Sequence, residues 1–195
     1  FEHADIPFVW RETPARRQLD IIERNEDKSC AAGWFKTPGR EAYARYTLPV
    51  YRDRPFVAVA RADNELLAET EILDRVLAEQ RLQVLVKEGY SYGSYIDDRM
   101  KHFAPEQVKT TAENQTILKM IEAHRADYSF MTEEEALDLL TFSGEKSTVF
   151  KIVHFSEMPP GNARHILCSR QVDPEIIARL NSAIGFLRQG EEELR

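Results

Sequence analysis

The feature that most constrains this chain is a regular alternation of two hydrophobic patterns along its 195 residues. Short, continuous apolar runs indicate strands, and longer segments with an apolar repeat of about 3.6 residues indicate helices. Strands that alternate with helices are typical of βα units, which build mostly parallel sheets flanked by helices. The alternation therefore predicts an α/β protein.

The expected strands are short and bounded by turn residues or helix starts. They cover residues 6–10, 28–35, 54–61, 82–89, 107–112, 126–132, 148–155 and 163–170. The expected helices cover residues 13–27, 37–46, 65–80, 90–103, 113–125, 132–142 and 173–190. In the first two helices, Thr13-Pro14 and Thr37-Pro38 place a capping hydroxyl ahead of a proline, which is typical of a helix start.

The order of these patterns also predicts two lobes. The middle of the chain has a complete strand–helix rhythm of its own, whereas the last strand and helix find partners only in the first block. We therefore expect a first lobe built from residues 1–62 and 155–195, and a second lobe built from residues 63–154. Two strands that cross between the lobes would form a hinge, with the ligand site in the crevice.

The charge balance argues against a nucleic-acid partner. The formal net charge is −7, and the chain has no basic run longer than Arg16-Arg17, whereas phosphate neutralisation needs a clustered basic face. Hydrophobic residues make up 43% of the chain, which is enough for a core. No apolar run reaches the roughly 18–20 residues of a membrane span, and the chain does not open with a charged-then-apolar leader.

Motifs for catalysis and metal binding are not found in the sequence. It contains no Gly-x-Ser-x-Gly, no His-Glu-x-x-His, no phosphate loop and no His/Cys metal spacing. The two cysteines, Cys30 and Cys168, are too far apart for a local metal knuckle, and the residues alone leave a disulfide or two buried thiols open. The residues alone therefore predict no catalytic, metal or cofactor site.

Four segments, in the same order, resemble the periplasmic solute-binding proteins of bacterial ABC transporters, specifically the amino-acid-binding type. They are residues 27–61, 82–97, 114–140 and 165–184. The resemblance implies the two-lobed type II fold, in which each lobe is a mostly parallel sheet flanked by helices and two hinge strands join the lobes. The family's first lobe opens with a further strand and helix, which we expect this chain to lack.

The resemblance places the first half of a ligand site around Arg40. This residue falls on the arginine that grips the ligand's α-carboxylate, because a planar guanidinium matches a carboxylate with two parallel hydrogen bonds. Backbone N–H groups of Gly33 and Phe35 would complete this anion site, and Trp10 would stack on the ligand. The alternatives are a surface ion pair between Arg40 and Glu41 and a core role for Trp10.

The second half is expected at the segment Gly89-Tyr90-Ser91, where a strand ends and a helix is expected to begin. Tyr90, Ser91 and Lys87 are the expected ligand contacts, although Lys87 also fits a solvent-facing strand end. Thr132 falls where the family has the aspartate that holds the ligand's ammonium, and a threonine cannot neutralise a buried positive charge. The ligand is therefore expected to lack an α-ammonium, unless Glu133 substitutes.

Together these features predict an extracytoplasmic protein that captures a small carboxylate-bearing solute, an amino acid or related organic acid. The expected partner is an ABC permease or a membrane sensor, the expected state is a monomer, and the expected compartment is the periplasm, with no signal peptide in this chain. The fold would place Cys30 beside Cys168, so a disulfide or free thiols stay open. The alternatives are a ligand-sensing domain of a receptor and a dehydratase-like enzyme using Glu133.

Overall fold

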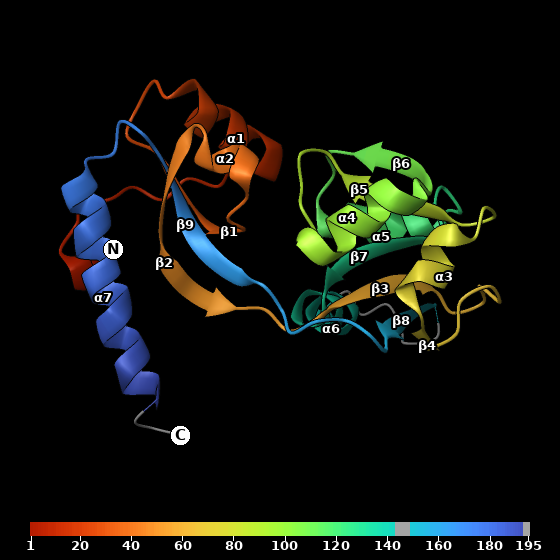
Figure 1. The fold of residues 1–195 in the computed structure, drawn as a ribbon. Helices are drawn as coiled ribbons and strands as arrows, with labels where there is room; N and C mark the ends of the chain where they lie inside the picture. The colour runs from red at the N-terminus through yellow and green to blue at the C-terminus, as the bar shows by residue number, and fades with distance from the viewer. Residues whose placement is uncertain (143–148, 193–195) are drawn as a thin grey trace. The chain divides into compact units, whose positions relative to one another are not determined.

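The computed structural model describes residues 1–142 and 149–192, so Thr148, the first residue of one expected strand, lies outside the described residues. The chain forms two compact units, the first made of Phe1–Arg52 and Ala163–Arg195 and the second of Asp53–Asn162 (Figure 1). These boundaries differ from the expected ones. The strands at residues 56–61 and 150–155 lie next to the expected boundaries. Both belong to the second unit, because they pair with each other and with its sheet.

Unit 1 contains a three-stranded sheet with the order β1-β9-β2. Its strands are β1 (Cys30–Trp34), β2 (Ala44–Arg52) and β9 (Ala163–Ser169). Both pairings are antiparallel, so the expectation of a mostly parallel sheet is wrong for this unit. A βα unit makes consecutive strands parallel, and the consecutive strands β1 and β2 do run parallel to each other. The strand between them, however, returns from unit 2 in the opposite direction.

The helices of unit 1 are η1 (Glu2–Ala4), α1 (Ala15–Arg24), α2 (Pro38–Glu41) and α7 (Pro174–Glu192). Helix α7 packs along β2 and against η1. Its apolar side joins a core of Ile166, Cys168, Val172 and Ile177. Cys30 and Cys168 are directly opposite each other in the β1–β9 ladder and form a disulfide, which settles the alternative that the residues left open.

Three expectations for unit 1 are corrected. Residues 6–10 are irregular rather than a strand. Because this segment pairs with no strand of the sheet, the side chain of Trp10 is 73% exposed. Helix α1 begins after Pro14, without a side-chain cap from Thr13. The helix expected over residues 37–46 is too long, because α2 ends at Glu41 and residues 44–46 belong to β2, whose ladder shifts register around Pro49. The hydroxyl of Thr47 also accepts the Ile166 N–H at 3.1 Å.

Unit 2 contains a six-stranded mixed sheet with the order β4-β8-β3-β7-β5-β6. Its strands are β3 (Phe56–Arg61), β4 (Thr70–Glu71), β5 (Gln83–Lys87), β6 (Glu106–Thr110), β7 (Tyr128–Thr132) and β8 (Phe150–Phe155). Strands β5, β6 and β7 are parallel, as βα units require, whereas β3 is antiparallel to both β7 and β8. Strand β3 is buried on both faces, as its apolar run predicts.

The helices of unit 2 are α3 (Leu73–Ala78), α4 (Ser94–Phe103), α5 (Asn114–Glu122) and α6 (Glu133–Phe142). On one face of the sheet, Val57, Val59 and Leu85 pack against Ile117 and Ile121 of α5. The opposite face is aromatic, with ring contacts that join Phe56, Tyr92, Tyr128, Phe130 and Phe155.

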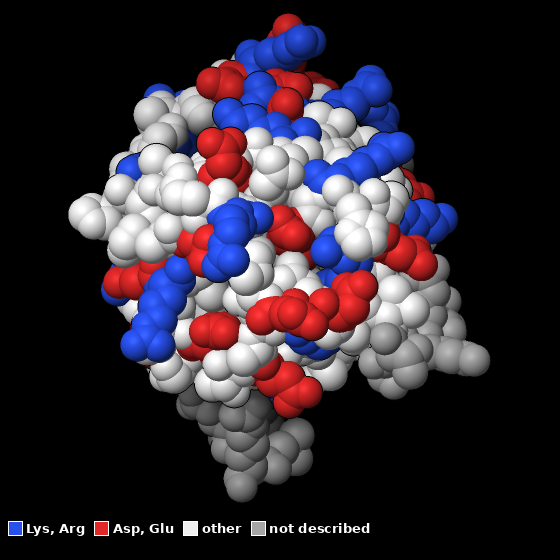
Figure 2. All heavy atoms as spheres, turned by 90° about the vertical axis from the view of Figure 1, so that its right-hand side faces the viewer, with Lys and Arg blue, Asp and Glu red and all other residues white. Residues whose placement is uncertain are grey.

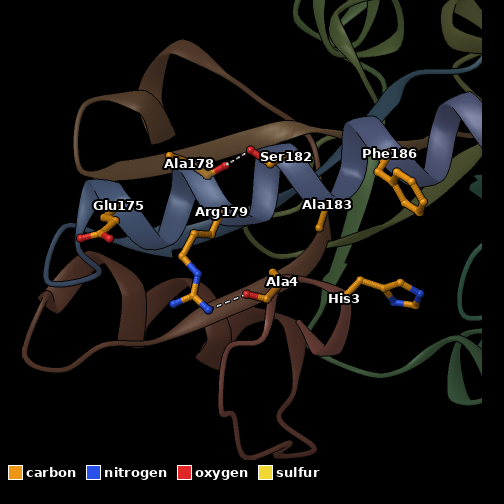
Figure 3. Close-up of a pocket in the computed structure, with 8 residues that line it drawn as sticks. All are labelled: His3, Ala4, Glu175, Ala178, Arg179, Ser182, Ala183 and Phe186. Atoms are coloured by element: carbon orange, nitrogen blue, oxygen red, sulfur yellow. Dashed lines mark hydrogen bonds between the residues drawn. The ribbon is translucent and has the colours of Figure 1, made fainter.

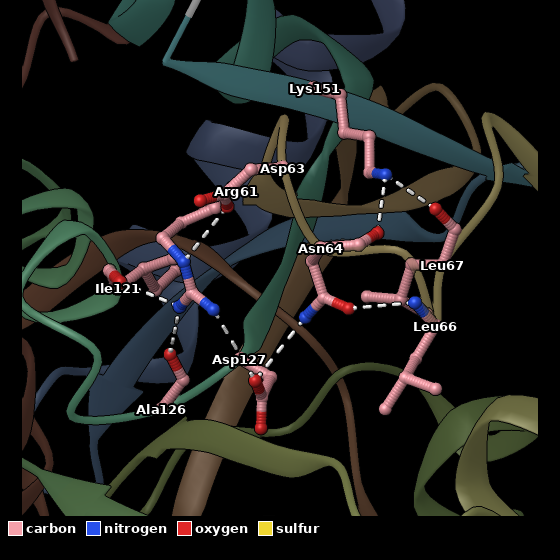
Figure 4. Close-up of polar contacts among 9 residues, drawn as sticks. All are labelled: Arg61, Asp63, Asn64, Leu66, Leu67, Ile121, Ala126, Asp127 and Lys151. Carbon is pink, nitrogen blue, oxygen red and sulfur yellow. Dashed lines mark hydrogen bonds and ion pairs between the residues drawn. The ribbon is translucent and has the colours of Figure 1, made fainter.

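The helix expected at residues 65–80 is wrong over its first half. Residues 64–68 form a turn, and only Leu73–Ala78 is helical. Figure 4 shows why: Lys151 of β8 donates to the carbonyl groups of Asn64 and Leu67, and the Asn64 side chain bonds to Asp127 at 3.2 Å. These long-range bonds override the local helical repeat.

The chain enters and leaves unit 2 through two adjacent segments. The Asp53 N–H donates to the Asn162 carbonyl at 3.0 Å. At Gly161 a Cβ atom would lie 1.7 Å from the Asp53 carbonyl oxygen, so only glycine allows the two backbones to approach this closely.

Candidate functional site

Arg40, the residue expected to grip a carboxylate, lies in α2 of unit 1 and is only 8% exposed. Thr37 caps this short helix as the sequence predicts, since its hydroxyl accepts the Arg40 N–H at 3.4 Å. The guanidinium donates to the Phe35 carbonyl at 3.1 Å and lies 4.8 Å from the centroid of the Trp34 ring. The side chain is therefore held in place by its own unit, and its burial contradicts the alternative of a surface arginine.

A second buried arginine, Arg164 of β9, lies in the same cluster. It donates to the Gly33 carbonyl at 2.9 Å, and its guanidinium carbon lies 3.8 Å from the centroid of the Phe35 ring. Gly33 is the extra residue of a β-bulge between Ala32 and Trp34, with φ of 84°. A left-handed residue in a bulge favours glycine, and this bulge directs the Gly33 carbonyl to Arg164.

Tyr46 of β2 completes the cluster around Phe35. Its hydroxyl donates to the Phe35 carbonyl at 3.0 Å, so this carbonyl accepts from both Tyr46 and Arg40. Burial raises the pKa of Tyr46 to about 12, although the nearby Arg40 charge opposes the shift. The cluster thus brings Gly33, Phe35 and Arg40 together, and it does so through the carbonyl groups of Gly33 and Phe35 rather than through the N–H groups that were expected to contact an anion. The exposed Trp10 is not part of it.

In unit 2, Lys87 lies at the last position of β5, where the carboxyl ends of the parallel strands β5, β6 and β7 share one edge. Its side chain is only 12% exposed, and its ammonium pairs with Glu113 at 3.1 Å. The ammonium also lies 5.4 Å from the centroid of the Tyr90 ring. The solvent-facing alternative for Lys87 is therefore wrong.

The expected helix start at Gly89-Tyr90-Ser91 is also wrong, because α4 begins at Ser94. Asp97, in the first turn of α4, accepts hydrogen bonds from the Tyr92 N–H at 2.9 Å and from the Ser91 hydroxyl. These bonds hold the segment as a loop ahead of the helix. Tyr90 and Ser91 therefore lie next to Lys87, in a loop rather than at a helix N-terminus.

Thr132 ends β7 and its side chain forms a capping box with Glu135 of α6. The Thr132 hydroxyl accepts the Glu135 N–H at 3.3 Å, and the Glu135 carboxylate accepts the Thr132 N–H at 3.0 Å. Thr132 is only 2% exposed. The capping box therefore fixes the position of Thr132 at the start of α6.

The residues of these clusters that were not anticipated from the sequence include Tyr46, Glu113 and Arg164. Arg164 carried a usable signal, because a charged residue in the apolar run of residues 163–169 needs a buried partner. Glu113 carried none, since it lies 26 positions from Lys87 and meets it only through the β5–β6 pairing.

The other surfaces of the described residues hold no second cluster of expected ligand contacts. A hollow of about 500 Å³ lies between η1 and α7 and contains none of the expected ligand contacts (Figure 3). There Arg179 donates to the Ala4 carbonyl at 2.6 Å and ties η1 to α7. Figure 2 shows a face on which acidic and basic side chains are intermixed. Across the described residues no group of three metal-ligating side chains is found, and none of the described helices could cross a membrane.

No protein-family model matches the chain, and no curated protein matches its sequence. Solved structures do. An ancestral arginine-binding protein bound to arginine aligns with a TM-score of 0.75 at 13% identity, over 96% of this chain and 77% of the other. The substrate-binding protein of an amino acid ABC transporter gives 0.75 at 13% identity, over 98% and 78%.

A third structure, the VFT2 domain of Bordetella pertussis BvgS as a double mutant, gives a TM-score of 0.64 at 17% identity, over 87% of this chain and 66% of the other. The likeness extends across both units and confirms the expected resemblance at the level of the fold. The chain has the two-lobed α/β fold of the substrate-binding proteins of amino acid ABC transporters.

Proposed function

We propose that this chain is an extracytoplasmic solute-binding protein that captures a small carboxylate-bearing solute. The observation that carries the proposal is the fold, because proteins that bind amino acids share it over 96% or more of this chain. Both expected halves of the site also form clusters of residues at strand ends, where ligands of open α/β sheets bind.

Arg40 is the proposed contact for the solute's carboxylate. A guanidinium carries five N–H donors in a rigid fork, and a carboxylate is the planar acceptor that fits it. The bond to Phe35 and the ring of Trp34 hold Arg40 in one orientation, which reduces the entropy lost when a ligand binds. Backbone groups of Gly33 and Phe35 lie in the same cluster, and Trp10 stays a proposed stacking contact.

The solute is proposed to lack an α-ammonium group. Thr132 has no charge to offer, and its hydroxyl is already in the capping box. Glu133, the possible substitute, lies 3.6 Å from Arg54 and 3.4 Å from His154. An α-ammonium buried at this position would therefore meet a carboxylate that already has Arg54 as a cationic partner, which favours organic acids over zwitterions.

The proposed compartment is the periplasm. The Cys30–Cys168 disulfide supports an oxidising environment, because such bonds are rare in the reducing cytosol. The proposed partner is an ABC permease that recognises the loaded protein, and the proposed state is a monomer without enzymatic activity. A ligand-sensing domain is the second candidate, favoured by the likeness to the BvgS VFT2 domain. A membrane-spanning segment elsewhere in the complete gene product would favour it.

The test is a thermal-shift screen of amino acids, keto acids, dicarboxylates and small peptides, followed by calorimetric titration of the best hit. A true ligand raises the melting temperature by mass action. Arg40→Lys keeps the positive charge but loses the planar guanidinium that forms two parallel hydrogen bonds. We expect this change to weaken binding about tenfold or more. The control is Arg45→Lys, because Arg45 bonds only weakly to the Arg170 carbonyl at 3.4 Å. No hit in the panel, or unchanged affinity in Arg40→Lys, would overturn the proposal.

A further inference from the structure

The ion pair between Lys87 and Glu113 is unequal, because its two side chains differ in burial. The Lys87 side chain is 12% exposed, whereas the Glu113 side chain is 61% exposed. A nearly buried ammonium needs a negative partner, since burying a charge without one is costly. An exposed carboxylate returns to water at little cost. The buried cation is therefore the permanent part of the pair, and its anion is exchangeable.

The backbone of Lys87 is fixed in its strand, whereas the Glu113 side chain is not bonded to its own helix. Lys87 is opposite Thr110 in the β5–β6 ladder, and the Tyr92 hydroxyl accepts the Lys87 N–H at 3.0 Å. Glu113 is the N-cap residue of α5, but its side chain makes no capping bond to that helix. If it leaves Lys87, its carboxylate stays close to the α5 N-terminus, whose dipole favours negative charge.

We propose that Glu113 is a built-in competitor for Lys87, and that an anionic group of the solute displaces it. The solute's anion pairs with the Lys87 ammonium beside Tyr90, and the Glu113 carboxylate turns into solvent. The inference rests on the proposed function for the presence of a solute, and it names what that solute carries. The proposed function supplies the solute with one carboxylate, and the group that displaces Glu113 is a second anion, so the substrate class is a dicarboxylate or a similar dianion.

The same geometry disfavours basic solutes. A guanidinium or ammonium group brought to the end of β5 would face the Lys87 charge, and like charges in a partly buried site repel. The ancestral relative of this fold was solved with arginine bound. This chain is expected to reject arginine and to prefer an acid.

The first experiment needs no knowledge of the solute and uses sulfate as the probe. Melting temperatures are measured at constant ionic strength for the wild-type protein, Glu113→Gln, Lys87→Met and the double variant. We expect sulfate to stabilise Glu113→Gln more than the wild type, because Lys87 has lost its resident anion. In the Lys87→Met protein, the further change Glu113→Gln should not increase the stabilisation by sulfate. The interaction energy of this double-mutant cycle therefore measures the replacement of Glu113 by sulfate at Lys87.

The second experiment compares glutarate with its monoamide, which differ by one negative charge at equal length. Glu113→Gln is expected to bind glutarate about threefold to tenfold more tightly than the wild type, with the monoamide unchanged. Glu122→Gln, an exposed residue at the far end of α5, is the matched control. Equal sulfate responses with and without Lys87, or an unchanged preference for the acid over the amide, would overturn the inference.

The outcomes separate the two proposals. If no solute binds but sulfate stabilises Glu113→Gln through Lys87, the anion position stands and the solute-binding proposal fails. If a solute binds through Arg40 and neither Lys87→Met nor Glu113→Gln changes the preference for the charged probe, the solute-binding proposal stands and the competitor role of Glu113 is refuted.

Discussion

The two units hold their buried cations in opposite ways. In unit 1, Arg40 and Arg164 donate to the backbone carbonyl groups of Phe35 and Gly33 and stack on aromatic rings. In unit 2, Lys87 pairs with the exposed side chain of Glu113. A backbone carbonyl cannot leave without disrupting its strand, whereas a side chain can rotate away. The arginines are therefore part of the scaffold, and the lysine is in an exchangeable pair.

The units also differ in what stabilises them. Unit 1 has a three-stranded sheet, and a disulfide joins two of its strands. Unit 2 has a six-stranded sheet whose two faces pack against helices and an aromatic cluster. A small sheet buries less apolar surface, so cross-links and charged hydrogen bonds contribute a larger share of its stability. Both tryptophans lie in unit 1, so tryptophan fluorescence reports on that unit alone.

The largest expected effect is the loss of the disulfide. It closes a loop with a sequence separation of 138, and replacing Cys30 and Cys168 by serine should lower the free energy of unfolding by roughly 2–5 kcal/mol. Denaturant unfolding followed by tryptophan fluorescence measures the loss in unit 1. If the double variant unfolds at the same denaturant concentration as the wild type, unit 1 does not depend on its cross-link.

A matched pair of methionine substitutions tests the fixed and exchangeable cations directly. Arg164→Met should cost about 1.5–3 kcal/mol, because it removes a charged hydrogen bond to Gly33 together with the stacking on Phe35. Lys87→Met should cost about 1 kcal/mol or less, because its partner is solvated and the methionine stays packed. Chemical denaturation measures the loss in the free energy of unfolding for both variants. Equal losses would contradict the distinction between fixed and exchangeable cations.

A glycine pair tests whether the bulge that carries the Gly33 carbonyl depends on its backbone conformation. Both Gly33 and Gly39 leave open space for a Cβ atom, but only Gly33 has positive φ, at 84°. Gly33→Ala should therefore cost about 1–2 kcal/mol, and Gly39→Ala, within α2, should be neutral or slightly stabilising. Thermal unfolding compares them, and a neutral Gly33→Ala would remove the need for this bulge geometry.

The smallest expected effect is a pH dependence at alkaline pH. Because the pKa of Tyr46 is raised to about 12 in the folded protein, its protonated form favours folding. This contribution is complete below pH 10, the ordinary tyrosine range, and is lost as the pH rises towards 12. Tyr46→Phe should flatten the fall in stability over this window, as followed by fluorescence of unit 1. If stability falls equally steeply with pH in Tyr46→Phe and in the wild type, a group other than Tyr46 causes the fall.

Local patterns predicted the elements that depend on local chemistry. The apolar run of β3 and the Thr37-Pro38 start of α2 were recognised because burial and capping are visible in a few residues. The helix over residues 37–46 was overextended because residues 44–46 pair with β9, a strand far along the chain. The helix over residues 65–80 was overextended because the contacts of Lys151 with the turn arise from a strand far along the chain.

The candidate site divides in the same manner. Arg40 was identified from its neighbours and the resemblance, and the structure places it beside Gly33 and Phe35. The contribution of Arg164 depends on β9 returning between β1 and β2, and that of Glu113 depends on β6 pairing with β5. Partners that meet only through sheet topology leave no signal in a single local pattern.

The central claim, that a solute docks on Arg40, is tested most directly by the fluorescence of Trp34. In Trp10→Phe protein, Trp34 is the remaining tryptophan, and its ring centroid lies 4.8 Å from the Arg40 guanidinium. Titration with the best-stabilising carboxylate should change its emission saturably, and Arg40→Lys should shift the midpoint about tenfold or more. A solute that stabilises the protein without any Trp34 response, or with the same midpoint in Arg40→Lys, would contradict the account.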